Sequence, residues 1–400
     1  MYLTQGLHRA AKLRQSDTAL ISPNRSFTWA EMRDRVARLA GALHRLGLQT
    51  EDRIAMLSLN SDRYAEYYYA TFWAGGLVVP MNIRWSQAEH VYSLNDSSAR
   101  FLVVDDQFAE MGAAVAQECK SVEFVIFAGD GETPAGMLNY EALIAEAEAI
   151  PDTFRKGEDL AGIFYTGGTT GFPKGVMLPQ RALWASAVAF GNTISISPKD
   201  RTLHAAPMFH IAGNATLFSI TTFGGSHAFM PGFEAGAFLR AVEAFKPTVT
   251  LLVPTMIGML MEHPDTEATD TSSLTRMIYG ASPISENVLK EAMRKLPETG
   301  FVHAYGQTEM SPLITLMGPE YHVLEGPMAG KIRSVGQTVF TVEAEVVDED
   351  GQELPRGDVG ELRTRGAQTM LGYWNKPEQT ADTLRDGWVH TGDGAYMDDE

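Results

Sequence analysis

The stretch Tyr165-Thr-Gly-Gly-Thr-Thr-Gly-Phe-Pro-Lys-Gly175 is a loop rich in glycine and threonine, with little side-chain bulk. Its glycines allow positive φ angles and close backbone approach, so consecutive N–H groups can converge on an anion. These glycines are Gly167, Gly168, Gly171 and Gly175. Thr166, Thr169 and Thr170 add hydroxyl donors, and Lys174 adds a mobile positive charge suited to a polyphosphate. The loop therefore predicts a phosphate-binding site.

The loop differs from a Walker-type phosphate-binding loop. The Walker pattern places Lys directly before Ser or Thr at the start of a helix, whereas here Pro173 precedes Lys174 and a glycine follows it. Apolar runs at 160–165 and 176–178 flank the loop and are typical of buried strands, and the next helix is predicted from about Gln180. We therefore expect the loop to join one strand to another. A solvated turn is the structural alternative.

Apolar runs and helix signals alternate along the first 334 residues. Thr28 with Glu31, and Ser86 with Glu89, form capping boxes at the starts of two predicted helices. Short buried strands are predicted at the apolar runs 53–59, 77–80, 101–104, 122–127, 248–253, 274–279 and 300–304. This alternation predicts an α/β fold with buried, mainly parallel sheets.

The pattern changes after Val335. Residues 339–347 and 360–365 are predicted strands, with an Asp350-Gly351 turn between them and few helix signals nearby. We therefore expect a two-lobed α/β region over residues 1–334 and a small β subdomain over residues 335–400.

Length and charge limit the classes of protein. Four hundred residues exceed what one hydrophobic core usually fills, so two or three subdomains are expected. The net charge of −18 argues against a nucleic-acid partner. The single Cys119 is expected to be a small core residue in a reducing compartment. Because no signal-peptide segment and no run of ~18 apolar residues is present, we expect a cytoplasmic protein without a transmembrane segment.

The loop at 165–175 resembles the signature loop of the adenylate-forming superfamily, which contains acyl-CoA synthetases, luciferases and peptide-synthetase adenylation domains. Gly167 stands where that signature usually has Ser, which removes one hydroxyl. The resemblance is closest to fatty or aryl acyl-CoA ligases. It implies two helix-flanked, mainly parallel sheets plus a small distorted β-barrel, in agreement with the strand pattern. It also implies ATP, Mg²⁺ and coenzyme A as cofactor and co-substrates.

A second segment, His303-Ala-Tyr-Gly-Gln-Thr-Glu309, follows a predicted buried strand, at the end where α/β sheets usually present ligand groups. Tyr305 offers a flat face for adenine, Thr308 a hydroxyl for the α-phosphate, and Glu309 a hard carboxylate for Mg²⁺. The resemblance implies the same roles and places Gly306 and Gln307 at the nucleotide. The alternative is a strand-end turn with a solvated glutamate.

Two further segments carry the resemblance. After the strand ending at Tyr279, a connection of small residues is implied to border the adenine and acyl groups: Gly280, Ala281 and Ser282. In Asp386-Gly-Trp-Val-His-Thr-Gly-Asp393, the resemblance assigns Asp393 to the ribose hydroxyls. The alternative for residues 280–282 is an ordinary strand-to-helix connection. The alternative for Asp393 is a common turn.

His210 lies between apolar residues in Ala206-Pro-Met-Phe-His-Ile-Ala-Gly213. In the family the matching His or aromatic residue lies beside the substrate carboxylate, so His210 joins Thr308 and Glu309 as a candidate catalytic residue. A structural histidine is the alternative, because the sequence shows no partner within hydrogen-bond reach. The segment contains no Asp to pair with an amino-acid ammonium, which favours an uncharged acyl tail.

Gly306 bears on the size of the acid. Acetate-specific members of the family carry Trp at the matching position, whereas Gly leaves the acyl tunnel open, so a medium- to long-chain fatty acid or an aryl acid is expected. Five apolar side chains would suit a pocket for either acid: Met208, Phe209, Phe229, Met230 and Met310. The alternative is that these five residues lie in the hydrophobic core.

The resemblance implies an acyl-CoA ligase. The acid and ATP give acyl-AMP and pyrophosphate, and coenzyme A then gives acyl-CoA and AMP. Family members continue beyond the position of Glu400 into a smaller carboxyl-terminal domain with an essential lysine, so we expect this chain to lack that domain and to be impaired in activity. Two alternatives stay open: an adenylation domain that loads a carrier protein, and a module that binds an adenylate without turnover. The oligomeric state also stays open, with a homodimer among the expected states.

Overall fold

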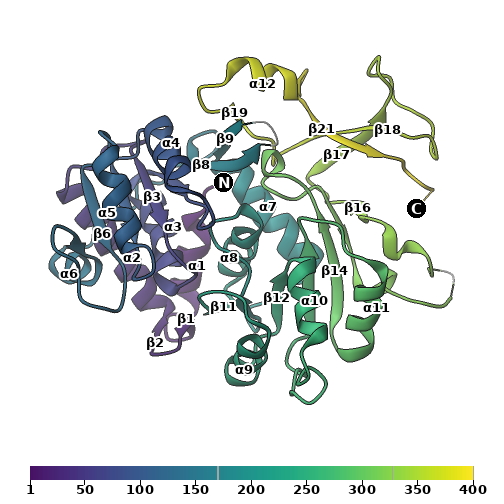
Figure 1. The fold of residues 1–400 in the computed structure, drawn as a ribbon, viewed down its shortest axis with the longest axis horizontal. Coiled ribbons are helices and arrows are strands. Elements are labelled where there is room, and N and C mark those ends of the chain that lie inside the picture. The colour runs from purple at the N-terminus through teal and green to yellow at the C-terminus, as the bar shows by residue number, and fades with distance from the viewer. Residues whose placement is uncertain (169–170, 327, 400) are drawn as a thin grey trace.

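A computed structural model of the chain describes residues 1–168, 171–326 and 328–399. Three sheets organise these residues, with eight, nine and four strands. Figure 1 shows most strands of the eight-stranded sheet in purple to blue, most strands of the nine-stranded sheet in teal to green, and the small sheet in yellow-green to yellow above the second lobe. The two larger sheets carry the helices, which confirms the predicted α/β class.

The eight-stranded sheet has the strand order β19-β9-β8-β4-β3-β5-β6-β7. Its strands are β3 (Arg53–Leu57), β4 (Leu77–Pro80), β5 (Phe101–Val104), β6 (Phe124–Phe127), β7 (Leu138–Asn139), β8 (Leu160–Gly168), β9 (Gly171–Pro179) and β19 (Gly372–Tyr373). β8 through β7 pair in parallel, whereas β8, β9 and β19 pair antiparallel with one another in that order. The antiparallel end of this sheet therefore carries the glycine-rich loop, which is called the phosphate loop below after its predicted role.

Helices pack against this sheet and between the lobes. They are α2 (Trp29–Arg45), α3 (Asp62–Ala74), α4 (Gln87–Ser97), α5 (Ala109–Glu118) and α6 (Tyr140–Glu146). Both predicted capping boxes are present, at Thr28 of α2 and Ser86 of α4. Every residue of α3 is buried, so its aromatic stripe belongs to the core.

The nine-stranded sheet has the order β16-β15-β14-β13-β12-β10-β11-β1-β2. Its strands are β1 (Thr18–Ser22), β2 (Arg25–Thr28), β10 (Arg201–His204), β11 (Ser226–Phe229), β12 (Val249–Leu252), β13 (Arg276–Gly280), β14 (Gly300–Tyr305), β15 (Thr315–Met317) and β16 (Gln337–Thr338). The central strands are parallel, and Gly280 of β13 lies opposite Ala304 of β14. Two predicted site segments therefore leave the same edge of the sheet.

The helices of this second lobe are α1 (Thr4–Leu13), α7 (Gln180–Thr193), α8 (Ile211–Phe223), α9 (Ala235–Phe245), α10 (Pro254–Glu262) and α11 (Glu286–Lys295). Three short 3₁₀ turns lie in the connections that follow β14: η1 (Thr308–Met310), η2 (Pro319–Tyr321) and η3 (Lys331–Arg333). α7 begins at Gln180, as the sequence predicts, directly after β9. The phosphate hairpin thus connects the first lobe to a helix of the second.

The third sheet is antiparallel and has the order β17-β18-β21-β20. Its strands are β17 (Val342–Val347), β18 (Gly360–Gly366), β20 (Leu384–Arg385) and β21 (Trp388–Ala395), and α12 (Pro377–Thr383) precedes β20. All four strands of this sheet lie within residues 342–395. Its connection from β18 to α12 passes through β19, which pairs with β9 of the eight-stranded sheet.

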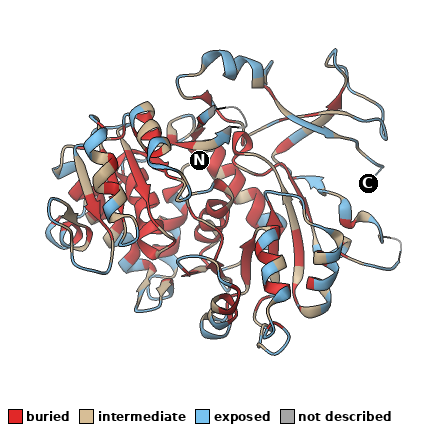
Figure 2. Cartoon of the chain, viewed as in Figure 1, coloured by how far each residue is buried: buried red, intermediate tan, exposed pale blue. Residues whose placement is uncertain are grey.

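Buried residues concentrate in the strands and inner helices of the two lobes, as Figure 2 shows. Cys119 is 3 % exposed, and burial raises the pKa of its thiol to about 11, so it is the core residue that the sequence predicts. None of the described helices is long and apolar enough to cross a membrane.

Candidate functional site

The phosphate loop connects two antiparallel strands, as predicted, with Thr166 of β8 opposite Lys174 of β9. Thr169 and Thr170 lie outside the described residues. At the start of β9, the Phe172 ring stacks on Tyr92 of α4, with centroids 4.5 Å apart and planes 18° from parallel. This stacking ties the hairpin to the first lobe.

Lys174 points toward the carboxyl-terminal part of the chain. Its Nζ lies 4.3 Å from the ring centroid of Tyr373, and the Tyr373 hydroxyl donates a 2.6 Å hydrogen bond to Oε1 of Glu309. Among the described residues, no ion pair involves Lys174. The structure therefore brings Lys174 and Glu309, which are far apart in sequence, to one tyrosine, with the ammonium at the ring face and the carboxylate at the hydroxyl.

Glu309 lies in η1, directly after β14, and is 9 % exposed. Met370 donates its backbone N–H to the Glu309 carbonyl over 2.9 Å, and no hydrogen bond between described residues involves Oε2 of Glu309. No group of three or more His, Cys, Asp or Glu in the described ranges could hold a metal ion. Mg²⁺ commonly binds through one or two carboxylates and the phosphates of its substrate, so a single accessible carboxylate oxygen fits that mode.

A cavity of about 510 Å³ brings most predicted site residues together. Its polar end is lined by Thr166, Gly167, Lys174, His210, Thr308 and Glu309. Gly280, Gly306 and Gln307 also line it. A second cavity of about 760 Å³ contains Ser282, Tyr305 and Asp393. Ala281, Ala304 and Gly306 line both, so the two cavities adjoin at the ends of β13 and β14.

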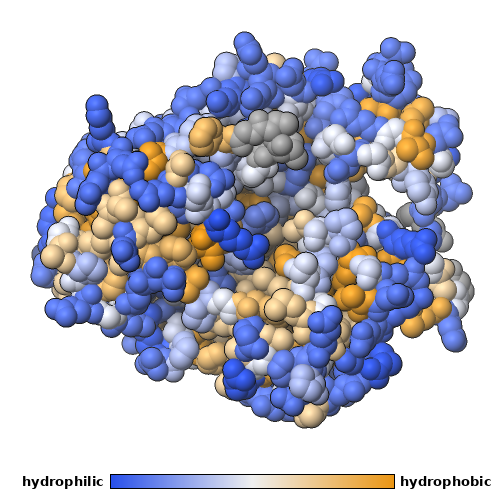
Figure 3. Space-filling model, viewed as in Figure 1, coloured by the Kyte–Doolittle hydropathy of each residue, from blue (hydrophilic) through white to orange (hydrophobic). Residues whose placement is uncertain are grey.

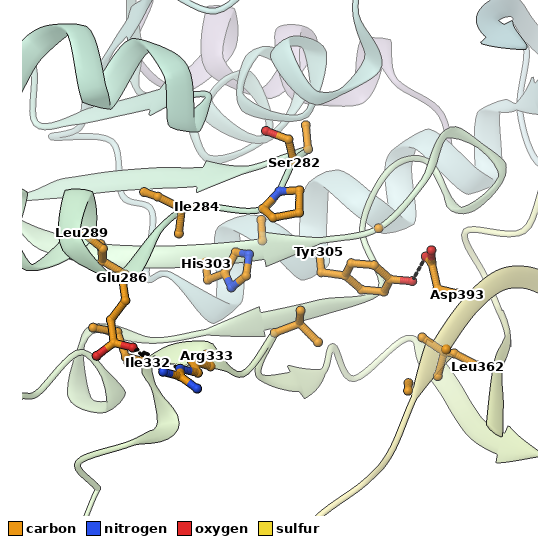
Figure 4. A pocket seen from close by; sticks show the side chains of 17 residues that line it. Ser282, Ile284, Glu286, Leu289, His303, Tyr305, Ile332, Arg333, Leu362 and Asp393 are labelled. Carbon is orange, nitrogen blue, oxygen red and sulfur yellow. Dashed lines mark hydrogen bonds and ion pairs between the residues drawn. The ribbon is translucent and has the colours of Figure 1, made fainter. Parts of the chain in front are cut away.

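Tyr305 and Asp393 both line the second cavity and meet directly there (Figure 4). The Tyr305 hydroxyl donates a 2.6 Å hydrogen bond to Oδ2 of Asp393. Burial, followed by the carboxylate of Asp393, raises the pKa of Tyr305, so its hydroxyl stays protonated at neutral pH. In Figure 3 the surface is hollowed between the second lobe and the small sheet, and hydrophobic side chains border the opening.

His210 caps the amino terminus of α8. Its Nδ1 accepts a 3.2 Å hydrogen bond from the backbone N–H of Ala212. The imidazole remains open to the cavity but is surrounded by protein, and the resulting desolvation lowers its pKa. A neutral imidazole whose Nδ1 accepts must carry its proton on Nε2. His210 therefore has one N–H left to donate.

Two glycines of the site lie where backbone segments approach closely. A Cβ at Gly280 would overlap the carbonyl oxygen of Ala304, and a Cβ at Gly306 would overlap that of Pro312. Both glycines are therefore required for the close packing of adjacent backbone segments. This requirement at Gly306 is separate from the open acyl tunnel that the sequence predicts there.

The five apolar residues considered for the acyl pocket lie elsewhere. Met208, Phe229, Met230 and Met310 are buried, Phe209 packs against the core, and none of them lines either cavity. The alternative of core positions is therefore correct. The apolar side chains at the 510 Å³ cavity instead include Phe190, Ile211, Ala215, Leu251 and Leu313. They come from α7, α8, β12 and the turn after η1, and no local motif marks them.

Sequence reasoning also missed Tyr373 and His303. The His303 ring stacks on Tyr279, with centroids 4.6 Å apart, and lines the second cavity. Tyr373 reaches the site only because β19 adds to β9. The dipeptide Gly372-Tyr373 carries no local sequence signal that it forms a strand beside β9. His303, in contrast, lies within a segment already singled out from the sequence, so it could have been included among the candidates.

Comparisons with known proteins agree with this geometry. The profile of the AMP-binding enzyme family matches residues 7–374. A feruloyl-CoA synthase from Amycolatopsis sp is 34 % identical over 98 % of this chain and 75 % of its own length, and an indoleacetate–CoA ligase from Aromatoleum aromaticum is 31 % identical over 100 % and 77 %. The crystal structure of the anthranilate CoA ligase AuaEII with anthranoyl-AMP superposes with a TM-score of 0.90 at 25 % identity, covering 100 % of this chain and 76 % of that one. The chain therefore belongs to the family of AMP-binding enzymes.

Proposed function

We propose that the chain activates a carboxylic acid with ATP, forming acyl-AMP and pyrophosphate, and then transfers the acyl group to coenzyme A. The observation that carries this proposal is the junction of the two cavities. One cavity holds an ammonium and a carboxylate suited to a metal-bound polyphosphate, and the other holds an aromatic ring and an acidic turn suited to a nucleoside. An adenylate spanning the junction would place its α-phosphate near Thr308.

In this proposal the phosphate hairpin and Lys174 bind the β- and γ-phosphates, and Thr308 donates its hydroxyl to the α-phosphate. Glu309 holds Mg²⁺, which would neutralise charge on the phosphates when bound. Tyr305 packs against adenine, and Asp393 accepts hydrogen bonds from the ribose hydroxyls. Gly280, Ala281 and Ser282 form the wall between the nucleotide and the acid.

We assign the acid to the apolar end of the 510 Å³ cavity. The Nε2–H of His210 is available there to donate to the substrate carboxylate. That donation would hold the carboxylate for attack on the α-phosphorus, a positioning effect that can lower a barrier by several kcal/mol. Apart from Lys174 and Glu309 at the polar end, no described lining residue is charged, which suits an uncharged tail.

Within the acids that the sequence leaves open, we propose a compact aryl acid. Phe190, Leu251 and Leu313 are 2 %, 8 % and 2 % exposed and belong to one hydrophobic cluster, so the apolar end closes against the core. A closed end limits acid length more than ring width. Three relatives are named for acyl groups or acids that carry an aromatic ring, namely feruloyl, indoleacetate and anthranilate, and these names support the same class.

Pyrophosphate release from Mg-ATP tests the proposal. We expect release to depend on cinnamate or benzoate, to be lower with octanoate and lowest with acetate, and to be followed by formation of the aryl-CoA when coenzyme A is added. Glu309→Gln is the negative control. Faster release with octanoate would contradict the aryl class, and acyl transfer to a carrier protein in place of coenzyme A would contradict the second step. If the folded protein shows neither acid-dependent release nor binding of an acyl-AMP analogue, the proposal is contradicted.

A further inference from the structure

We propose that Tyr373 is a positioning residue of the site: it separates Lys174 from Glu309, so that the cation stays available for phosphate and the carboxylate for Mg²⁺. This inference rests on the proposed function, and it assigns a role to a residue of the small β19 strand, outside the motif segments quoted in the sequence analysis.

The backbone fixes Tyr373 between the two charged groups. Tyr373 pairs with Val176 of β9, two residues beyond Lys174, and the Trp374 N–H donates to the Gly175 carbonyl over 2.7 Å. On the other side, the Met370 N–H donates to the Glu309 carbonyl over 2.9 Å. The segment 370–374 is therefore hydrogen-bonded to both the phosphate hairpin and η1. Tyr373 is 4 % exposed and has little freedom to leave this position.

The hydroxyl of Tyr373 orients the Glu309 carboxylate. Its 2.6 Å hydrogen bond engages Oε1, whereas Oε2 of this cavity-lining residue has no hydrogen-bond partner among the described residues. The phenol is the donor in this bond, because an ionised carboxylate oxygen can only accept. Partners that hydrogen-bond a metal-binding carboxylate typically fix its orientation and change metal affinity about 10- to 100-fold when removed.

The ring of Tyr373 holds Lys174 by a different interaction. The ammonium lies over the ring face, 4.3 Å from its centroid, within the range of a cation–π contact. Such a contact is weaker than pairing with phosphate, so it holds the lysine in the cavity and still lets it move to the nucleotide. Without the ring, Lys174 and Glu309 could pair directly, and each would neutralise the group that the ligand needs.

Two variants of the full chain separate these roles. Tyr373→Phe keeps the ring and removes the hydroxyl, whereas Tyr373→Ala removes both. Binding of a fluorescent ATP analogue is measured while Mg²⁺ is titrated, and again in EDTA. We expect Tyr373→Phe to raise the half-saturating Mg²⁺ concentration roughly 10- to 100-fold while leaving metal-free binding unchanged. We expect Tyr373→Ala also to weaken metal-free binding several-fold, because Lys174 is then free to pair with Glu309.

The matched control is Tyr140→Phe. Tyr140 is also buried and donates a 3.0 Å hydrogen bond to a glutamate, Glu66, but it lies in the first lobe and lines neither site cavity. We expect this variant to lose thermal stability without a change in Mg²⁺ requirement. If Tyr373→Phe and Tyr140→Phe have the same Mg²⁺ requirement as the original chain, the inference on Tyr373 is overturned and the proposed function stands. If the original folded chain binds no ATP at all, the proposed function itself is overturned.

Discussion

Tyr305 and Asp393 are 88 positions apart in the chain, yet the hydroxyl of the first lies 2.6 Å from the carboxylate of the second. Tyr305 ends β14 of the nine-stranded sheet, and Asp393 lies in β21 of the small sheet. The hydrogen bond therefore joins two sheets across the 760 Å³ cavity. A nucleoside in this cavity would contact both Tyr305 and Asp393. Substitution of either residue therefore tests whether the cavity binds a nucleoside.

Asp393→Ala is expected to weaken ATP binding roughly 10- to 100-fold, because a carboxylate that accepts hydrogen bonds from ligand hydroxyls contributes more than a neutral acceptor. The Kd is measured by displacement of a fluorescent ATP analogue. Asp350→Ala, at an exposed turn of the same subdomain, provides the control and should bind as the original chain does. Equal Kd values for all three proteins would remove Asp393 from the nucleotide site.

Lys174→Ala is expected to weaken Mg-ATP binding about 10-fold or more, since it removes the cation that the described hairpin directs into the cavity. The melting temperature should change little, because the cation–π contact with Tyr373 contributes only about 0.5–1 kcal/mol at an accessible site. Lys199→Ala removes an exposed lysine and is the matched control. A large loss of stability with unchanged ATP affinity would make Lys174 a structural residue.

Gly306→Ala is expected to destabilise the fold by about 1–3 kcal/mol, the usual cost of forcing extra atoms into packed structure, because its Cβ would overlap the Pro312 carbonyl. Gly258→Ala makes the same change in α10, where nothing lies within 4 Å of the added atom, and should be neutral or slightly stabilising. Urea unfolding measures both. Similar stability for the two variants would mean that the backbone at Gly306 is not closely packed.

Acid should destabilise the protein through buried histidines. Nε2 of His204 lies 3.0 Å from Nδ1 of His227, and burial lowers the pKa of His204 to about 3. Between about pH 6.5 and that value, the unfolded chain binds a proton at His204 that the folded chain does not. The free energy of unfolding should therefore fall as pH falls through this window, by up to about 1.4 kcal/mol per pH unit for this group.

His204→Gln tests this pH dependence, because glutamine does not titrate. We compare urea unfolding of the variant and the original chain at pH 7 and pH 5. The variant should be less stable at pH 7 but should lose less stability between the two pH values. An identical loss in both proteins would show that the proton uptake occurs elsewhere.

Local sequence patterns predicted the fold well where the structure of a helix or strand depends on residues close together in sequence. The capping boxes at Thr28 and Ser86 set two helix starts, and the loop at 165–175 joins two strands as its flanks indicated. Glu309 and Thr308 could be placed because polar residues directly after a buried strand lie at its carboxyl end. These inferences need only neighbours in sequence.

The remaining site could not be predicted because it depends on contacts between distant segments. Tyr373 enters through a two-residue strand, and Phe190, Leu251 and Leu313 meet from three elements. Apolar periodicity marks such residues as buried but does not distinguish a cavity wall from the core. For the same reason, Met208 and the other four residues considered for the acyl pocket have side chains that would suit a pocket. The structure places them in the core.

Calorimetric titration with stable acyl-AMP analogues decides whether the two adjoining cavities form one adenylate site, because binding requires both cavities but no turnover. Cinnamoyl, octanoyl and acetyl forms are compared on the folded chain. We expect the cinnamoyl form to bind at least about 100-fold more tightly than ATP, as for an analogue of a reaction intermediate, and more tightly than the octanoyl and acetyl forms. Absence of binding by all three would contradict the adenylate site, and equal binding of the three would contradict the compact acyl pocket.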